Sequence, residues 1–215
     1  CPDKINSEEW LEAHRTAHGV GIASNITIMF GSIERPEHWV RHLLRCRDLQ
    51  EETGGFTEFV GLPFVHMASP IYLQRKARRG PTFRENLLMH SVARIAYHGL
   101  IDNIQASWVK EGSRMSQLLL AAGVNDLGGT LINESISTAA GAQHGQLMRL
   151  TEFRQMIRRA GRIPAERYTT YKTRRVFSDA DQELDPLDLV GDNVEEVFGS
   201  YDRLVKLDTY RFEHP

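Results

Sequence analysis

Apolar residues along the chain follow two patterns, short continuous runs and longer segments with helical spacing. Two of the short runs have polar residues inside them: residues 21–31, which end in a glycine, and residues 56–66. The segment between them has a helical period and stops at the pair Gly54-Gly55. Because short apolar runs bounded by turn residues are typical of buried strands, we predict two strands joined by a helix.

The same alternation continues toward the carboxyl terminus. Short runs at 101–109 and 124–131 predict a third and a fourth strand, the fourth with a glycine-rich end. Helical spacing predicts helices over 6–19, 36–53, 82–98, 113–122 and 150–160. Four strands alternating with helices predict an α/β fold with a parallel sheet. From about Lys172 the pattern fails, and one amphipathic turn or helix is predicted near 193–206.

Composition and charge narrow the function classes. The chain has 215 residues, 41% of them hydrophobic, with a formal net charge of −2, so we expect neither a nucleic acid nor an anionic membrane surface as a partner. No apolar run approaches the roughly 20 residues of a membrane span. The two cysteines, Cys1 and Cys46, favour the cytoplasm or another reducing compartment. Because the chain opens on Cys1 rather than Met, we expect a fragment or a processed product.

Strand periodicity assigns side chains to faces. In the first strand the apolar set should meet helices, and it comprises Ile26, Ile28 and Phe30. The mixed set should face the opposite side, which in a barrel is the lumen, and it comprises Asn25, Thr27 and Met29. One face of the third strand is polar and carries Asn103, Gln105 and Ser107.

Glu58 is the most conspicuous single residue, and it shares a face of the second strand with His66. A carboxylate inside an apolar strand is costly unless it is paired or hydrogen-bonded. Two interpretations remain open at this point. Glu58 either forms a structural salt bridge to an Arg or Lys of a neighbouring element, or it takes part in function.

The glycine-rich segment Asn125–Thr130 offers backbone N–H groups and small residues at the end of the fourth strand. It is either a tight turn or a ligand contact, and its place at a carboxyl strand end favours the ligand.

The histidine and arginine clusters are weaker indications of a functional site than Glu58 or the glycine-rich segment. His14 and His18, like His38 and His42, are four residues apart, but neither pair opens a zinc-type His-Glu-x-x-His motif, so we predict solvated helix surface and no metal site. The basic cluster Arg75–Arg79 is interpreted as a solvated loop, with closure over an anionic substrate group as the alternative.

Several segments taken together resemble a known family. They are Ile28–Gly31, Glu34–Trp39, Thr53–Phe59, Leu62–His66, Asn103–Gln105, Ser107–Lys110 and Asn125–Thr130. In combination they resemble the radical S-adenosylmethionine enzymes that make deazaflavin, above all the tyrosine-using half of FO synthase, and the similarity runs from about Cys1 to about Tyr171. The sequence departs from the family pattern at Ser32, Gly61 and Ala106, where His, Pro and Thr are expected.

The resemblance implies a fold and a reaction. The fold would be the C-terminal half, about strands five to eight, of a radical SAM TIM-type barrel, with residues 1–171 as the partial barrel and 172–215 as a poorly ordered extension. The cofactors would be S-adenosylmethionine and a 4Fe-4S cluster whose cysteine ligands lie upstream of Cys1. The substrates would be tyrosine and 5-amino-6-ribitylaminouracil, and a missing N-terminal half or a partner subunit would complete the enzyme.

The resemblance also implies roles for individual residues. The family's strand beside the adenine matches Thr27, Met29, Gly31 and Glu34, which are expected to bind the cofactor. Glu58 and His66 are expected to act in catalysis. The expected substrate-binding residues are Asn25, Gln105, Ser107, Asn125, Asp126, Gly128, Gly129 and Thr130. Two alternatives to a deazaflavin enzyme remain: a radical enzyme of the futalosine route to menaquinone, and a half-barrel remnant without catalysis.

Overall fold

A central parallel sheet has three strands in the order β1, β2, β3. The computed structural model describes residues 4–132, 134–144, 147–178, 181, 184–191, 194–199, 203 and 206–210. Its strands are β1 (Ser24–Phe30), β2 (Phe56–Pro63) and β3 (Asn103–Ala106). The predicted α/β fold with a parallel sheet is confirmed. The predicted fourth strand is wrong in extent, because residues 124–131 contribute only an isolated bridge between Asp126 and Gln105.

Helices alternate with these strands. They are α1 (Ser7–Gly19), α2 (Pro36–Thr53), α3 (Pro70–Leu73), α4 (Phe83–Ala96), α5 (Trp108–Leu119), α6 (Ser135–Ala139), α7 (Leu150–Arg159) and α8 (Val194–Phe198), with 3-10 turns η1 (Pro186–Leu189) and η2 (Asp208–Tyr210). Capping boxes at Asn6 and Thr82 start α1 and α4. Helix α5 begins five residues before the predicted 113: β3 already ends at Ala106, a helical turn starts at Trp108, and Gly112 (φ 76°) kinks the chain between this turn and the predicted helix.

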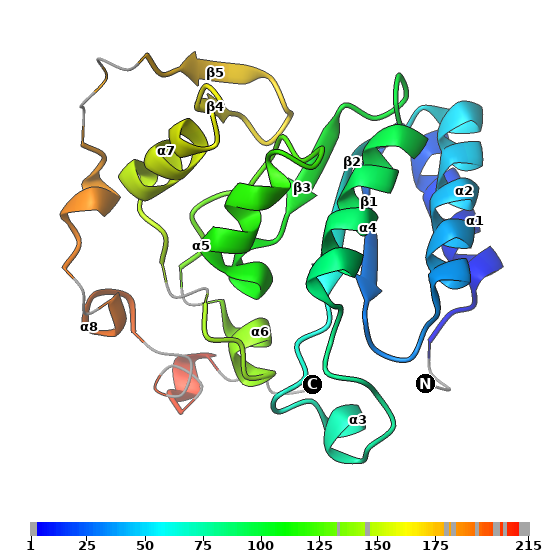
Figure 1. Cartoon of the computed structure of the whole chain (residues 1–215), viewed down its shortest axis with the longest axis horizontal. Coiled ribbons are helices and arrows are strands. Elements are labelled where there is room, and N and C mark those ends of the chain that lie inside the picture. The colour runs from blue at the N-terminus through cyan, green and yellow to red at the C-terminus, as the bar shows by residue number, and fades with distance from the viewer. Residues whose placement is uncertain are drawn as a thin grey trace.

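The hydrophobic core lies between one face of the sheet and helices α1, α2, α4 and α5 (Figure 1). Ile26 and Phe30 are fully buried there, and the Phe30 ring meets Trp39 of α2 edge to face at 5.7 Å. On the opposite face of β1 the side chains Asn25, Thr27 and Met29 are exposed. The predicted division of β1 into a helix-facing set and a second, more polar set is confirmed.

The two ends of the sheet are covered by different elements. Figure 1 shows α3 and α6 at one end and the antiparallel hairpin of β4 (Ala165–Arg167) and β5 (Thr173–Val176) at the other. The segments that contain α3 and α6 meet, since the Ala68 N–H donates to the Ala140 carbonyl. The predicted division between residues 171 and 172 falls inside the turn of this hairpin, which the sequence pattern did not predict.

The histidine pair of α1 belongs to a hydrogen-bond network rather than to solvated surface. His14 Nδ1 and His18 Nε2 each lie 2.8 Å from Ser24 Oγ, and His18 Nδ1 lies 2.6 Å from Thr53 Oγ1. Burial lowers the pKa of both rings. The predicted solvated surface is therefore wrong for this pair, because both rings pack against the start of β1.

The two histidines of the second pair, on α2, differ in burial. His38 is exposed, as predicted, whereas His42 is partly buried and burial lowers its pKa to about 4. Within the described ranges, His, Cys, Asp and Glu form no group of three that could hold a metal ion. In that same part of the chain no helix has the length and apolar character to cross a membrane.

Candidate functional site

The loop after β1 is organised around the carboxylate of Glu34. That carboxylate accepts hydrogen bonds from the backbone N–H groups of Gly31, Ser32 (3.1 Å) and Ile33 (2.9 Å) and from Trp39 Nε1 (3.0 Å). Burial would raise the pKa of Glu34, but these hydrogen bonds hold it below its usual value. Glu34 thus fills a nest of backbone donors with the protein's own charge, and its role here is to shape the loop.

Replacing this carboxylate should loosen the loop. Glu34→Gln is expected to lower the free energy of unfolding by about 2 kcal/mol, because the amide loses the charge and one acceptor oxygen while three backbone donors remain. Chemical denaturation followed by tryptophan fluorescence measures this, with exposed Glu37→Gln as the matched control. Equal stability of Glu34→Gln and the parent at pH 7 would contradict the assignment.

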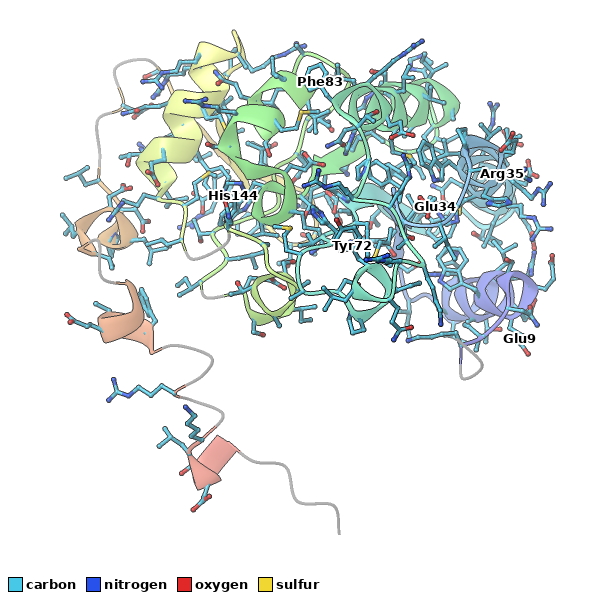
Figure 2. All side chains as sticks on the ribbon, turned by 60° about the horizontal axis from the view of Figure 1, so that its bottom comes forward. Glu9, Glu34, Arg35, Tyr72, Phe83 and His144 are labelled. Carbon is cyan, nitrogen blue, oxygen red and sulfur yellow. The ribbon has the colours of Figure 1, made fainter. Side chains whose placement is uncertain are left out.

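His66 lies just after the carboxyl end of β2. Its ring packs against Tyr72 of α3, with ring centroids 4.7 Å apart. Figure 2 turns the end of the sheet that carries α3 and α6 toward the reader, with Glu34 and Tyr72 labelled. Of the basic cluster, Arg78 is held by Glu85 at 2.8 Å and lies over the Trp39 ring, so it is a structural residue rather than a free cation.

Polar and glycine residues gather after β3 as well. The Ser107 carbonyl accepts the N–H groups of Lys110 and Glu111 and starts α5. Trp108 Nε1 donates to the Gly129 carbonyl at 3.0 Å. Gly128 has φ +74°, and a Cβ there would lie 3.2 Å from the Gln105 amide nitrogen. The structure therefore brings together Gln105, Gly128 and Gly129, with half-buried Thr130 next in sequence.

Asn125 does not belong to this group. Its side-chain oxygen accepts from Arg94 of α4 at 2.8 Å and from the Ile104 N–H at 2.9 Å. Asp126, the next residue, pairs with Gln105 on the other face. Asn125 thus fastens the 124–126 segment to α4 and β3, on the side away from the predicted lumen.

Glu58 lies at the opposite end of β2 from His66. It is the third residue of the strand, in register with Asn25 of β1 and Asn103 of β3, and only 2% of it is exposed. The Tyr171 hydroxyl donates to Glu58 Oε2 at 3.3 Å, and the Arg167 guanidinium lies 3.6 Å from Oε1. The two predicted catalytic residues are therefore held at different ends of the sheet.

The environment of Glu58 favours its protonated form. Burial and the neighbouring Asp126 carboxylate raise its pKa to about 7, although Arg167 and the Tyr171 hydroxyl act in the opposite direction. Arg167 also pairs with Asp126 through two hydrogen bonds, one of them 3.0 Å long. The Asn25 side-chain oxygen accepts from Thr57 Oγ1 and from the Tyr171 hydroxyl. This end of the sheet is closed by the β4–β5 hairpin.

Two sets of polar residues were missed by sequence reasoning. The first is Arg167 with Tyr171; a lone glutamate in an apolar strand predicts a cationic partner but does not say where in the chain it lies. The second is His90 with Glu111, both side chains fully buried, with Nε2 and Oε1 3.7 Å apart. Gly61 makes room for this pair, since a Cβ there would lie 2.9 Å from His90 Nε2.

The described residues do not fit an iron–sulfur cluster. Such clusters bind deprotonated cysteine thiolates. Cys46 is fully buried, and its burial raises the pKa of the thiol to about 12, while Cys1 lies outside the described residues. The loop after β1 fits an adenine ring better than the described residues fit a cluster. Met29 presents an apolar side chain there that is 59% exposed, next to the Gly31 turn.

The geometry of the sheet and its loops is that of a ligand-binding α/β protein. A parallel α/β sheet whose glycine turns and polar groups collect after the carboxyl ends of its strands is typical of proteins that bind small ligands there. Residues 53–180 match the family model described as the CofH/MqnC C-terminal region, and the chain belongs to this family.

Curated relatives agree with this assignment. The chain is 53% identical over 172 residues to the 5-amino-6-(D-ribitylamino)uracil--L-tyrosine 4-hydroxyphenyl transferase of Methanocaldococcus jannaschii, covering 80% of this chain and 48% of that protein. The transferase of the same name from Methanopyrus kandleri is 48% identical over 82% of this chain and 48% of its own length. The FO synthase of Nocardia farcinica is 51% identical over 78% of this chain and 19% of its own length. The chain thus spans about half of the transferases and about a fifth of the FO synthase.

Proposed function

We propose that this chain is the carboxyl half of a deazaflavin-forming radical enzyme. In this proposal the enzyme transfers a tyrosine-derived hydroxybenzyl group to 5-amino-6-ribitylaminouracil. The single observation that carries the proposal is about 50% identity to transferases and FO synthases over four fifths of the chain. The family description also covers CofH and MqnC together. The high identity to the deazaflavin enzymes favours them over a menaquinone enzyme.

The free edge of the sheet supports a barrel completed by further chain. Among the described strands, β1 pairs only with β2. Along its other side lies a groove of about 460 Å³, bounded by α1 and α2 and including Thr27, Ile28 and Met29 in its lining. An exposed strand edge is a template for another strand. We infer that an amino-terminal half, on the same protein or on a partner subunit, pairs with β1 and supplies the cluster ligands.

The two ends of the sheet would then have different roles. Bound S-adenosylmethionine and its cluster would supply a deoxyadenosyl radical, and a reducing compartment suits such chemistry. Thr27 and Met29 would contact the adenine, and Gly31 with Glu34 would shape the loop beside it. His66, Gln105, Ser107, Gly128, Gly129 and Thr130 would contact or orient the substrates from the same end.

Glu58 would act from the opposite end of the sheet. Its burial, its register with Asn25 and Asn103 and its contacts with the hairpin favour a positioning role beneath the substrates over direct contact with them. Asp126 shares that role through its two hydrogen bonds with Arg167.

The cofactor assignment is tested by binding. In the full-length protein, Met29→Glu is expected to weaken S-adenosylmethionine at least tenfold in isothermal titration calorimetry, because a charge replaces the apolar side chain beside the adenine. Leu44→Glu, on the exposed face of α2, is the matched control and should bind like the parent. Equal affinity of Met29→Glu and the parent would remove β1 from the cofactor site.

A further inference from the structure

Four side chains from three parts of the chain meet at the amino end of the sheet. Glu58 comes from β2, Asp126 from the segment beside β3, and Arg167 and Tyr171 from the β4–β5 hairpin. Arg167 is hydrogen-bonded twice to Asp126 and lies 3.6 Å from Glu58 Oε1. The Tyr171 hydroxyl reaches both Glu58 Oε2 (3.3 Å) and Asn25 Oδ1 (3.1 Å). The hairpin therefore contacts β1, β2 and the segment beyond β3 at once.

The charges of this cluster balance only if one carboxyl is neutral. It holds two carboxyls and one guanidinium, and the neighbours in register with Glu58 on β1 and β3, Asn25 and Asn103, are uncharged. Asp126 has the two hydrogen bonds to Arg167, whereas Glu58 Oε1 is buried with no hydrogen-bond partner among the described residues. Because Arg167 hydrogen-bonds directly to Asp126 but lies 3.6 Å from Glu58 Oε1, Glu58 is the carboxyl of the two that takes up a proton more readily.

The hairpin turn is held in an uncommon conformation. Tyr171 has φ +65°, in the left-handed region that residues with a Cβ rarely adopt because it is energetically costly. Its ring lies under the Arg167 guanidinium at 4.6 Å, and the Tyr168 N–H donates to the Lys172 carbonyl to close the turn. The contacts with Arg167, Asn25 and Glu58 offset this cost, so the turn and the cluster stabilise each other.

The cluster also reaches the glycine turn of the candidate substrate loop. The Asp126 carboxylate that Arg167 holds accepts the Gly128 N–H at 2.7 Å. Asp126 is at the same time the residue that bridges to Gln105 of β3. One carboxylate therefore connects the hairpin at one end of the sheet to the glycine turn that faces the other.

We propose that Arg167 and Tyr171 are positioning residues, which close the amino end of the sheet with the β4–β5 hairpin and, through Asp126, fix the Gly128 turn for substrate binding. The substrate part of this statement rests on the proposed function. The closure and its connection to Gly128 are properties of the chain and are measured without turnover.

The experiment uses the full-length protein and two readouts. The variants are Arg167→Gln, Tyr171→Phe and Asp126→Asn. The first readout is amide hydrogen exchange at Gly128 and at Phe177, whose N–H donates to the Pro164 carbonyl beside the hairpin. We expect at least tenfold faster exchange at both amides in Arg167→Gln. The second readout is the titration midpoint of the Glu58 carboxyl by ¹³C NMR.

The sign of each midpoint shift is set by the cluster. Arg167→Gln and Tyr171→Phe remove a cation and a hydrogen-bond donor that favour ionised Glu58, so the midpoint should rise. Asp126→Asn removes a like charge, so the midpoint should fall. The matched controls are Arg174→Gln, in an exposed pair with Glu166, and Tyr168→Phe, with an exposed side chain in the same turn. Both controls should match the parent in midpoint and exchange.

The exchange rates and the Glu58 midpoints together test the positioning role of Arg167 and Tyr171. Unchanged exchange at Gly128 in Arg167→Gln, or midpoints that do not follow these signs, would overturn it. If Arg167→Gln does not fold, the milder Tyr171→Phe and Asp126→Asn decide by the direction of the midpoint. If all variants follow the expected pattern but the parent transfers no group to the uracil, the proposed function fails and the closure stands.

Discussion

Gly31→Ala is expected to lower the free energy of unfolding by about 3 kcal/mol, the largest loss among the substitutions considered. Gly31 has φ +91°, where a Cβ costs roughly 1–2 kcal/mol. A Cβ at this position would also lie 2.2 Å from the Pro81 nitrogen, which is backbone and cannot rotate away. Moving the backbone costs a further 1–3 kcal/mol or so. The displaced loop would in addition lose hydrogen bonds to Glu34.

The measurement is urea denaturation of parent and variant under the same conditions. Gly19→Ala is the matched control, because Gly19 ends α1 with open space around its Cα and should show a small gain or no change. A Gly31→Ala variant as stable as the parent would mean that the loop after β1 does not pack against Pro81 as described. It would also remove the physical reason for a glycine at the start of this loop.

Glu58→Gln is expected to stabilise the protein by about 3 kcal/mol at pH 8 and to leave it unchanged below pH 4.5. The folded pKa of Glu58 is about 7, compared with an ordinary 4.5. The folded state thus binds the proton more tightly than the unfolded state, and the stability this contributes is lost as pH rises from 4.5 through 7. Glutamine is never ionised, so the variant avoids the loss, which amounts to ~1.4 kcal/mol per pKa unit.

Unfolding free energies at intervals between pH 4 and 8.5 test this prediction. Glu111, whose burial raises its pKa to about 8, gives a slope of the same sign, so Glu58→Gln should remove part of the loss of stability with rising pH and Glu58→Gln with Glu111→Gln more of it. The lowered pKa values of His14, His18 and His42 give a slope of the opposite sign below about pH 6.5, which both variants keep. The exposed control Glu37→Gln should follow the parent. A Glu58→Gln variant that is less stable than the parent at pH 8 would show that the ionised carboxylate is favourably paired in the folded state and that the folded pKa of Glu58 is not raised.

Local pattern predicted the elements whose burial follows a simple period. Alternation in β1 placed Ile26 and Phe30 against the helices, and helical spacing predicted α1 and α4, which the structure starts with capping boxes at Asn6 and Thr82. The helix of residues 150–160 was also predicted, because Phe153 and Met156 face the core at helical spacing. In each case the information lies within a few residues of the element.

Long-range contacts were beyond the sequence pattern. The segment 124–131 resembles a strand in composition. The side chain of Asp126 hydrogen-bonds to Arg167 and that of Asn125 to Arg94, and only one bridge to β3 forms. Both strands of the β4–β5 hairpin are short and rich in charged residues, and β5 is exposed along its whole length, so neither shows the apolar alternation that predicts a strand. Two of the hairpin's partners, Asn25 and Glu58, lie more than 100 residues from Tyr171 along the chain, and Asp126 lies 41 residues from Arg167.

The candidate site was predicted in parts. The set Gln105, Gly128 and Gly129 is brought together as expected, because the ends of adjacent parallel segments meet. Glu58 was singled out correctly as an unusual buried carboxyl, but its position near the start of β2 separates it from His66. The alternation of side chains along a strand shows which face of the sheet a residue is on, but not which end of the sheet it lies near.

The proposed function is tested most directly by an assay for the reaction itself. The full-length protein, reconstituted anaerobically with its cluster and supplied with a one-electron reductant such as dithionite, is incubated with S-adenosylmethionine, tyrosine and 5-amino-6-ribitylaminouracil and analysed by liquid chromatography and mass spectrometry. We expect 5′-deoxyadenosine together with a product in which the uracil has gained a hydroxybenzyl group, formed only when all three compounds are present. Deoxyadenosine without that coupled product, or no consumption of tyrosine, would contradict the proposed function.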